Sequence, residues 1–130
     1  MQTVLSNLIL DHAPLAALVG NHAHWDEMLQ GTPLPNVVMF VISGVTNYTM
    51  NGPKPPFMAR VQFDCRGTSA AQARAVAEAL EEKLSGGFGV FQGFDFQGCF
   101  EQSQRTGSDK DGASRWFYDS RDYNIHWAPA

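Results

Sequence analysis

The alternation of hydrophobic and polar residues is clearest in the middle of the chain, over residues 59–66. The apolar members of this stretch occur at every second position and are Ala59, Val61, Phe63 and Cys65. A period of two is typical of a strand with one buried face. After Gly67 the apolar residues recur at helical spacing, at Ala73, Val76, Ala77, Leu80 and Leu84. The pattern therefore predicts a strand followed by an amphipathic helix.

The start and end of this helix are also marked in the sequence. Ser69 and Gln72 have the spacing of a capping box, in which each side chain accepts a hydrogen bond from a backbone N–H that the helix leaves free. The helix should therefore start near Ala70. The pair Gly86-Gly87 should end it.

The N-terminal part of the chain predicts two short helices. Apolar residues over 3–18 favour a helix that ends at Asp11-His12, and Pro14 suits the first turn of a second helix, which Gly20 closes. Residues 21–30 show no period and are predicted to be irregular.

A long hairpin is predicted next. The run Val37 to Ile42 is continuous and β-branched, which favours a central strand buried on both faces, and Val45 to Met50 can extend that strand. The segment Asn51 to Pro56 holds three prolines, which cannot donate ladder hydrogen bonds, so it is predicted to be a turn outside the ladder. Phe57 to Arg66 would then return antiparallel.

The C-terminal third predicts two strands joined by a loop. Val90 to Gln102 reads as one half-buried strand weakened by Gly93 and Gly98. Residues 103–113 are polar and glycine-containing, so they are expected to be flexible and to become ordered only against a partner. The last strand should run from about Arg115 to Trp127, with a bulge near Asp119-Ser120, where the apolar parity changes.

These elements predict one α+β domain over residues 1–130. We expect a mostly antiparallel sheet of four to five strands with a long hairpin, packed against an N-terminal helix and the capped, alanine-rich helix. The formal net charge of −4 and the pI near 5.4 argue against tight nucleic-acid binding, which needs clustered Lys and Arg. The longest apolar segment is too short to cross a bilayer and no secretion signal precedes it, so a cytoplasmic protein without a membrane is expected.

The residues that could carry metal or redox chemistry do not form a complete motif. His22 and His24, with Asp26 and Glu27 nearby, have the alternate spacing of metal ligands, but no second cluster completes the site, and a surface loop explains them. No metal site is therefore predicted. Cys65 and Cys99 fall on different strand phases, so their thiols are not expected to point the same way or to form a disulfide.

Catalytic patterns are equally incomplete. The glycine-rich residues 85–89 follow a helix instead of opening one, so they do not form a phosphate-binding loop. Asp119, Arg121 and Asp122 could place a cation between two carboxylates, but nothing in the sequence joins them to a nucleophile or base. The sequence therefore predicts neither an enzyme nor a cofactor. Its strand aromatics are expected to be core residues.

The absence of charge in one long segment is the strongest functional signal. No Asp, Glu, Lys or Arg occurs from Met28 to Pro53, although much of this segment is too rich in Pro, Gly and Asn to be core. Charge is depleted at the buried centre of subunit contacts, so this segment predicts a self-assembling or partner-covered protein. The interface residues that we predict in the hairpin and in the polar loop are Val45, Asn47, Tyr48, Met50, Asn51, Pro53, Pro55, Arg105, Ser108, Asp109 and Lys110.

The order of these features resembles a known family. The segments that carry the resemblance are Pro14 to Gly20, Gln30 to Val38, Arg60 to Cys65, the alanine-rich helix and the C-terminal strand ending in an aromatic residue. Together they are similar to the tail-terminator or tail-completion proteins of long-tailed phages and gene transfer agents. The similarity covers nearly the whole chain. The proline-rich hairpin tip at residues 51–56 and the segment 22–25 depart from the pattern.

The resemblance implies a non-enzymatic virion protein that assembles in the cytoplasm of a bacterial host. It would form a homohexameric ring that caps the tail tube, ends its polymerisation and offers a surface for joining the head in the neck region. The implied partners are other copies of the chain, the tail tube protein and the head-closure or connector protein, with DNA passing through without tight binding. Two alternatives stay open: another neck adaptor such as a head-closure protein, and a small cytoplasmic ligand-binding or enzymatic domain.

Overall fold

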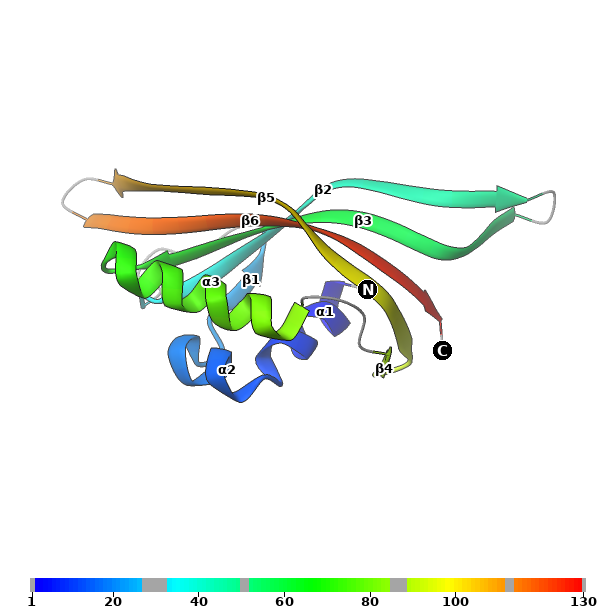
Figure 1. Ribbon diagram of the computed structural model, residues 1–130, viewed down its shortest axis with the longest axis horizontal. Coiled ribbons are helices and arrows are strands. Elements are labelled where there is room, and N and C mark those ends of the chain that lie inside the picture. Colours follow the sequence, from blue (N-terminus) through cyan, green and yellow to red (C-terminus); the bar gives the residue numbers. More distant parts are fainter. Residues whose placement is uncertain (1, 27–32, 50–51, 85–88, 112–113, 130) are drawn as a thin grey trace.

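The computed structural model describes residues 2–26, 33–49, 52–84, 89–111 and 114–129. Within these residues, three helices cover one face of a six-stranded sheet, and the opposite face carries no helix (Figure 1). The helices are α1 (Gln2–Leu10), α2 (Ala13–Val19) and α3 (Ala70–Leu84). The strands are β1 (Ala23–Trp25), β2 (Asn36–Thr49), β3 (Gly52–Gly67), β4 (Gly89–Phe91), β5 (Phe94–Asp111) and β6 (Ser114–Pro129).

The sheet has the order β1-β2-β3-β6-β5-β4. β2, β3, β6 and β5 form antiparallel pairs, as does β4 with β5, whereas β1 runs parallel to β2. The α+β class and the long hairpin are thus confirmed, but the sheet is mixed and has more strands than predicted. The segment that was predicted to be irregular includes β1. The three residues of this strand pair in parallel with Val37 to Met39 of β2.

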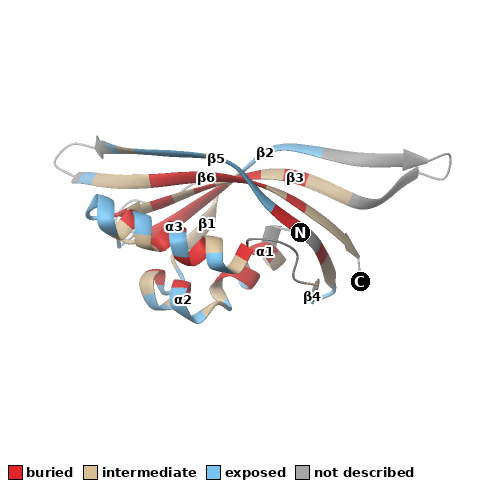
Figure 2. Cartoon of the chain, in the orientation of Figure 1, coloured by how far each residue is buried: buried red, intermediate tan, exposed pale blue. Residues whose placement is uncertain are grey.

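The core lies between the helices and the inner face of the sheet (Figure 2). Its largest fully buried side chains include Phe63 on β3, Tyr123 on β6 and Phe96 on β5, and the rings of Phe63 and Tyr123 meet edge to face at 5.6 Å between centroids. Leu80 and Leu84 of α3 pack into the same cluster. The predicted amphipathic helix and its strand therefore form the centre of the protein.

The predicted cap of α3 is present in a modified form. The backbone N–H of Gln72 donates to Ser69 Oγ at 3.1 Å, as in a capping box. The side chain of Gln72, however, accepts from Thr68, from both its backbone N–H and its hydroxyl. The reciprocal contact therefore forms one residue earlier than predicted, and the helix still begins at Ala70.

The hairpin ladder reaches further than the prolines suggested. Asn47 pairs with Lys54, Tyr48 with Pro53 and Thr49 with Gly52, so the prediction of a turn outside the ladder over residues 51–56 is wrong for Gly52 to Lys54. A proline is tolerated here because β6 pairs with β3 only from Phe57 onwards, so the proline-containing part of β3 lies at a sheet edge. The predicted burial on both faces is confirmed for Val37 to Met39, which are fully buried, but it is wrong for Val41 and Ile42, which are 40% and 50% exposed.

The strand predicted over residues 90–102 is instead two strands. Gln92 and Gly93 have φ values of 48° and 84°, the left-handed geometry of a tight hairpin turn, and this turn separates β4 from β5. The segment 103–111, predicted to be a flexible loop that needs a partner, is the second half of β5 and pairs along its length with β6. The polar composition suggested a loop because, of the side chains that the structure describes in this half of β5, those of Gln104, Arg105, Thr106 and Ser108 are exposed.

In the ladder of β5 and β6, the bulges lie in β5 and not in β6. β6 pairs with β3 without interruption from Phe117 to Trp127, so no bulge occurs at Asp119-Ser120. Register shifts occur in β5, between Phe96 and Gly98 and again between Glu101 and Ser103. A one-residue shift moves every later side chain to the other face.

Candidate assembly surfaces

The distal half of the β2–β3 hairpin forms an arm, made of Val45 to Thr49 and Gly52 to Pro56. Its two strands pair with each other, and β6 does not extend along them. Figure 1 shows this arm projecting beyond the helical layer at one end of the sheet. The predicted interface residues on its two strands are Val45, Asn47, Tyr48, Pro53 and Pro55, whereas Met50 and Asn51 lie outside the described residues.

The other predicted interface residues lie on the second half of β5. Arg105 pairs with Ser120 of β6, Ser108 with Phe117, Asp109 with Trp116 and Lys110 with Arg115. This hairpin points away from the arm, toward the opposite end of the sheet (Figure 1). The structure therefore does not bring the two predicted sets together. It places them at opposite ends of the protomer.

A polar basin of about 340 Å³ lies on the face of the sheet that has no helix, which we call the outer face. It is lined by Gln62, Asp64, Arg66, Arg105, Trp116, Tyr118 and Ser120. Its members come from β3, β5 and β6. Alternate residues of a strand share a face, which is why side chains well separated in the sequence meet here.

Hydrogen bonds link the polar side chains that line the basin. Asp64 Oδ1 accepts from Ser120 Oγ at 2.7 Å and from Gln62 Nε2 at 2.8 Å. Arg105 Nη2 donates to Gln62 Oε1 at 3.2 Å, and the guanidinium of Arg66 lies 5.3 Å from the ring centroid of Trp116. The basin thus brings two guanidinium groups and one carboxylate together. The resulting small positive charge can attract a negatively charged partner without binding it tightly.

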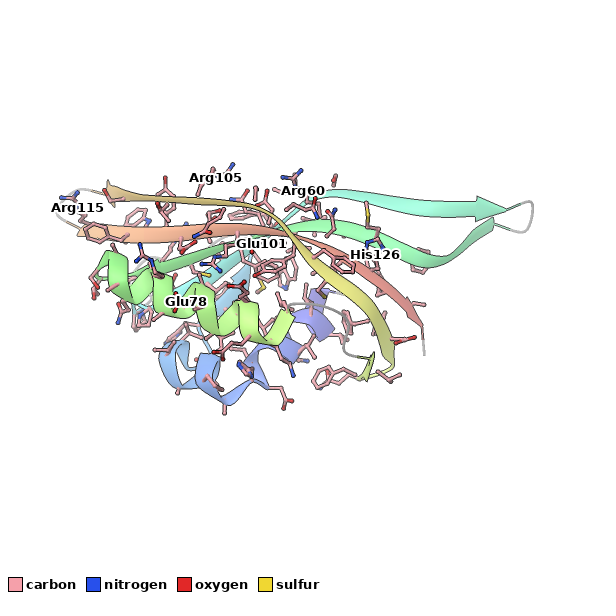
Figure 3. The ribbon with its side chains drawn as sticks, in the orientation of Figure 1. Arg60, Glu78, Glu101, Arg105, Arg115 and His126 are labelled. Atoms are coloured by element: carbon pink, nitrogen blue, oxygen red, sulfur yellow. The ribbon has the colours of Figure 1, made fainter. Side chains whose placement is uncertain are left out.

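A second polar group lies on the same face, beside the basin. Arg60 Nη2 donates to Asp122 Oδ2 at 2.9 Å, and Ser103 Oγ donates to the same oxygen at 3.1 Å. Figure 3 shows Arg60 and Arg105 on the side of the sheet away from α3, the helix that carries Glu78. The outer face is therefore polar and interleaved in charge.

The inner face holds a buried ion cluster. Arg121 donates from Nη1 to Glu81 Oε2 of α3 at 2.8 Å and from Nε to Asp119 Oδ1 at 3.2 Å, and its Nε lies 3.9 Å from Glu101 Oε1. Burial by itself would lower the pKa of Arg121, but the hydrogen bond and charge of Asp119, then Glu81, raise it above its usual range. Asp119 and Arg121 meet as the sequence allowed, whereas Asp122 lies on the other face. The cluster ties α3 to the sheet.

The two cysteines do not offer a reactive thiol. Both are buried and free, and both belong to the core cluster. Burial raises the pKa of Cys65, with a further contribution from the charge of Asp119, and burial raises the pKa of Cys99 to about 12. The prediction that the thiols point in different directions is wrong, because the shift in β5 turns Cys99 inward.

The histidine segment contributes a strand to the sheet. His24 lies on β1 opposite Val38. The backbone N–H of Ala23, which lies between the two histidines, donates a hydrogen bond to the carbonyl oxygen of Asn21. Within residues 2–26, 33–49, 52–84, 89–111 and 114–129, no group of three or more His, Cys, Asp or Glu side chains could hold a metal ion. Glu27 lies outside these residues. Across the same described ranges, no helix is long and apolar enough to cross a membrane.

Sequence reasoning missed the exposed apolar residues at the two borders of the sheet. Val41 and Ile42 on β2 are 40% and 50% exposed, and Val90 on β4 and Phe100 on β5 are 68% and 52% exposed. The signal for Val41 and Ile42 was present, since they lie within the uncharged segment from Met28 to Pro53, but a continuous apolar run looks the same whether it is buried or covered by another subunit.

A family model and a solved structure place the chain among known proteins. The family model described as tail completion protein gp17 matches residues 3–121. Comparison with curated proteins gives no match. A solved structure titled as the virion of a native gene transfer agent particle contains a chain with a similar fold, with a TM-score of 0.64 and 18% identity, covering 97% of this chain and 96% of that one.

Proposed function

Because this chain belongs to the tail completion protein gp17 family, whose members are structural proteins of phage tails, we propose that it caps the tail tube and ends its polymerisation. In this proposal residues 1–130 act as one tail-terminator domain, present as a hexameric ring between the tail tube protein and the head-closure or connector protein. Assembly takes place in the cytoplasm of the bacterial host, and the final location is the neck of the virion. The family match over residues 3–121 carries the proposal.

The shape of the protomer supports a role in assembly. A two-stranded ribbon is at best marginally stable in water, yet the arm extends as a ribbon beyond β6. Contact with a neighbouring subunit or with the tube would cover it. We propose that the arm residues Val45, Asn47, Tyr48, Pro53 and Pro55, together with Met50 and Asn51, form one such contact. Arg105, Ser108, Asp109 and Lys110 form a second contact at the opposite end.

The electrostatics support a channel through which DNA slides. The chain has a formal net charge of −4, and on the outer face Arg60 pairs with the carboxylate of Asp122 and Arg105 with the amide of Gln62. Tight DNA binding needs many unpaired cations along the phosphate backbone. A ring of such protomers would let DNA pass without holding it. We assign the protein no catalytic step.

The family match also favours this role over that of a head-closure protein. The two roles differ in what their loss does to tails. A terminator is needed to stop the tube, whereas a head-closure protein is needed only to seal the head.

The test is to disrupt the gene in a strain that produces the particles and to measure tail length by electron microscopy. Loss of the protein should give tails of excessive and irregular length without attached heads, and a plasmid copy of the gene should restore both properties. Tails of normal length without the protein would overturn the proposal. Tails of normal length that fail to join heads would favour the head-closure role.

A further inference from the structure

The exposed apolar side chains gather at the two open borders of the sheet. Among the residues whose side chains the structure describes, the large exposed ones are Val41, Ile42, Val90 and Phe100. The first two lie on β2, and the others lie on β4 and β5, at the opposite border of the strand order. Apolar groups at a border are covered when another strand is added to the sheet.

Backbone pairing is also incomplete at both borders. β1 pairs with β2 only at Val37 to Met39, and β4 pairs with β5 only at Phe94 to Phe96. Within the described residues this leaves two open stretches, Phe40 to Thr49 (the β2 edge) and Gly98 to Asp111 (the β5 edge). The β2 edge contains no charged residue and no proline, the devices that normally prevent an edge from pairing.

The register across the sheet aligns the two apolar patches. Ser43 pairs with Arg60, Arg60 pairs with Asn124, and Asn124 pairs with Phe100. Ser43 and Phe100 thus occupy the two ends of the same rung, and Ile42 is the bulged residue beside Ser43. The patches therefore lie at the same height on opposite borders of one protomer.

Phe100 has a fixed position on the outer face. Its ring lies over Gly98, where a Cβ would come within 2.6 Å of the ring. The ring also meets that of His126, with 6.0 Å between centroids. Phe100 is thus a preformed aromatic anchor at the β5 edge, of the kind that contributes strongly to interfaces.

Strand direction decides how copies can join. Because β2, β3, β6 and β5 alternate in direction, β2 and β5 run opposite to each other. A rotation that repeats the protomer around a ring places the β5 edge of one copy beside the β2 edge of the next, and the two then run antiparallel. We propose that these two edges pair, so that Phe100 of one copy packs against Ile42 of the next and the sheet continues from subunit to subunit.

The occupant of each edge is a second copy of this chain, because every protomer carries both halves of the contact. Such head-to-tail contacts form a ring when the rotation between copies closes, whereas pairing of two β2 edges would stop at a dimer and leave Phe100 exposed. This inference rests on the proposed ring, and it names the surfaces that build it.

Disulfide trapping tests the pairing. The variant Ile42→Cys with Phe100→Cys is oxidised mildly, both as purified protein and in tails from producing cells, and run on a non-reducing gel. We expect a ladder of cross-linked species from dimer upward. Ile42→Cys alone and Phe100→Cys alone should stay monomeric, and a mixture of the two single variants should stop at dimers. The buried Cys65 and Cys99 do not compete. Ile42→Cys with Glu78→Cys on α3 is the matched control.

Each outcome is decisive. Dimers from Ile42→Cys alone would show that two β2 edges pair and would overturn the proposal. A double variant without a ladder in tails of normal length would also overturn it, while leaving the terminator role intact, since tail length tests that role separately. A ladder in the Glu78→Cys control would mean unspecific contact and would count against the pairing. A ladder in the double variant alone supports it, whatever the effect of gene disruption on tail length.

Discussion

Arg121 donates a hydrogen bond from Nε to Asp119 Oδ1 at 3.2 Å, and both residues are buried. They lie two positions apart on β6, so their side chains share one face of the sheet. The same guanidinium reaches Glu81 on α3. One cation thus fastens the main helix to the sheet, and it is held by a carboxylate from its own strand.

Removing Asp119 should destabilise the protein strongly. Asp119→Ala leaves the buried Arg121 without its one fully buried partner among these carboxylates, and breaking a buried ion pair in this way costs about 3 kcal/mol of unfolding free energy. Urea unfolding followed by circular dichroism measures it. The double variant Asp119→Ala with Arg121→Met removes the unpaired charge as well and should recover part of the loss. A double variant less stable than Asp119→Ala alone would contradict this account.

Removing the cap of α3 should have a smaller effect. Ser69 Oγ accepts from the backbone N–H of Gln72, and losing such a cap costs about 1 kcal/mol. Ser69→Ala should therefore lower the urea midpoint, whereas Ser69→Asp, which keeps an acceptor and adds a favourable negative charge at a helix start, should not. Equal loss in both variants would point to a different role for this residue.

Stability should fall as the pH rises above 9. Burial raises the pKa of Cys99 from 9.0 to about 12, so the folded state keeps a proton that the unfolded state releases in this range. The contribution of the thiol is complete below pH 9 and is lost between pH 9 and about 12, at about 1.4 kcal/mol per pH unit. Urea unfolding of Cys99→Val and of the wild type at pH 8 and pH 10 tests this. The variant should lose less stability between the two values, and an equal loss would refute the assignment.

A charge on the arm should weaken assembly without unfolding the protomer. Tyr48 lies on the uncharged part of β2, where the ladder partner is Pro53. Tyr48→Asp would place an unpaired carboxylate in the proposed contact, whereas Tyr48→Phe would keep the apolar ring. Analytical ultracentrifugation should show smaller assemblies for the first variant and unchanged ones for the second. Unchanged assembly of a folded Tyr48→Asp protein would remove the arm from the interface.

The sequence predicted the local elements correctly where a single local pattern determined the structure. The alternation over residues 59–66, the helical spacing from Ala73 to Leu84 and the proline at the start of α2 each reflect a single local constraint, and each element is present. The predictions failed where a longer-range contact decided the outcome. β1 is only three residues long and exists because β2 offers it a partner.

The candidate interface could be predicted only in part. Missing charge marked the β2 edge from the sequence, because charged groups are costly in a covered surface. Residues 103–111 looked like a loop, since polar residues alone do not distinguish a loop from an exposed strand. Their pairing with β6 makes them the second border of the sheet.

The sequence by itself thus determined the strand and helix periods, the cap at Ser69 and the uncharged segment, since each depends on neighbouring residues. Only the tertiary structure decided which face each side chain occupies after the shifts in β5, so that Cys99 turned inward and Phe100 outward. It also decided that Ile42 and Phe100 lie at the same height on opposite borders. The physical reason is that sheet register is set between strands distant in the chain, and one extra residue reverses every face that follows.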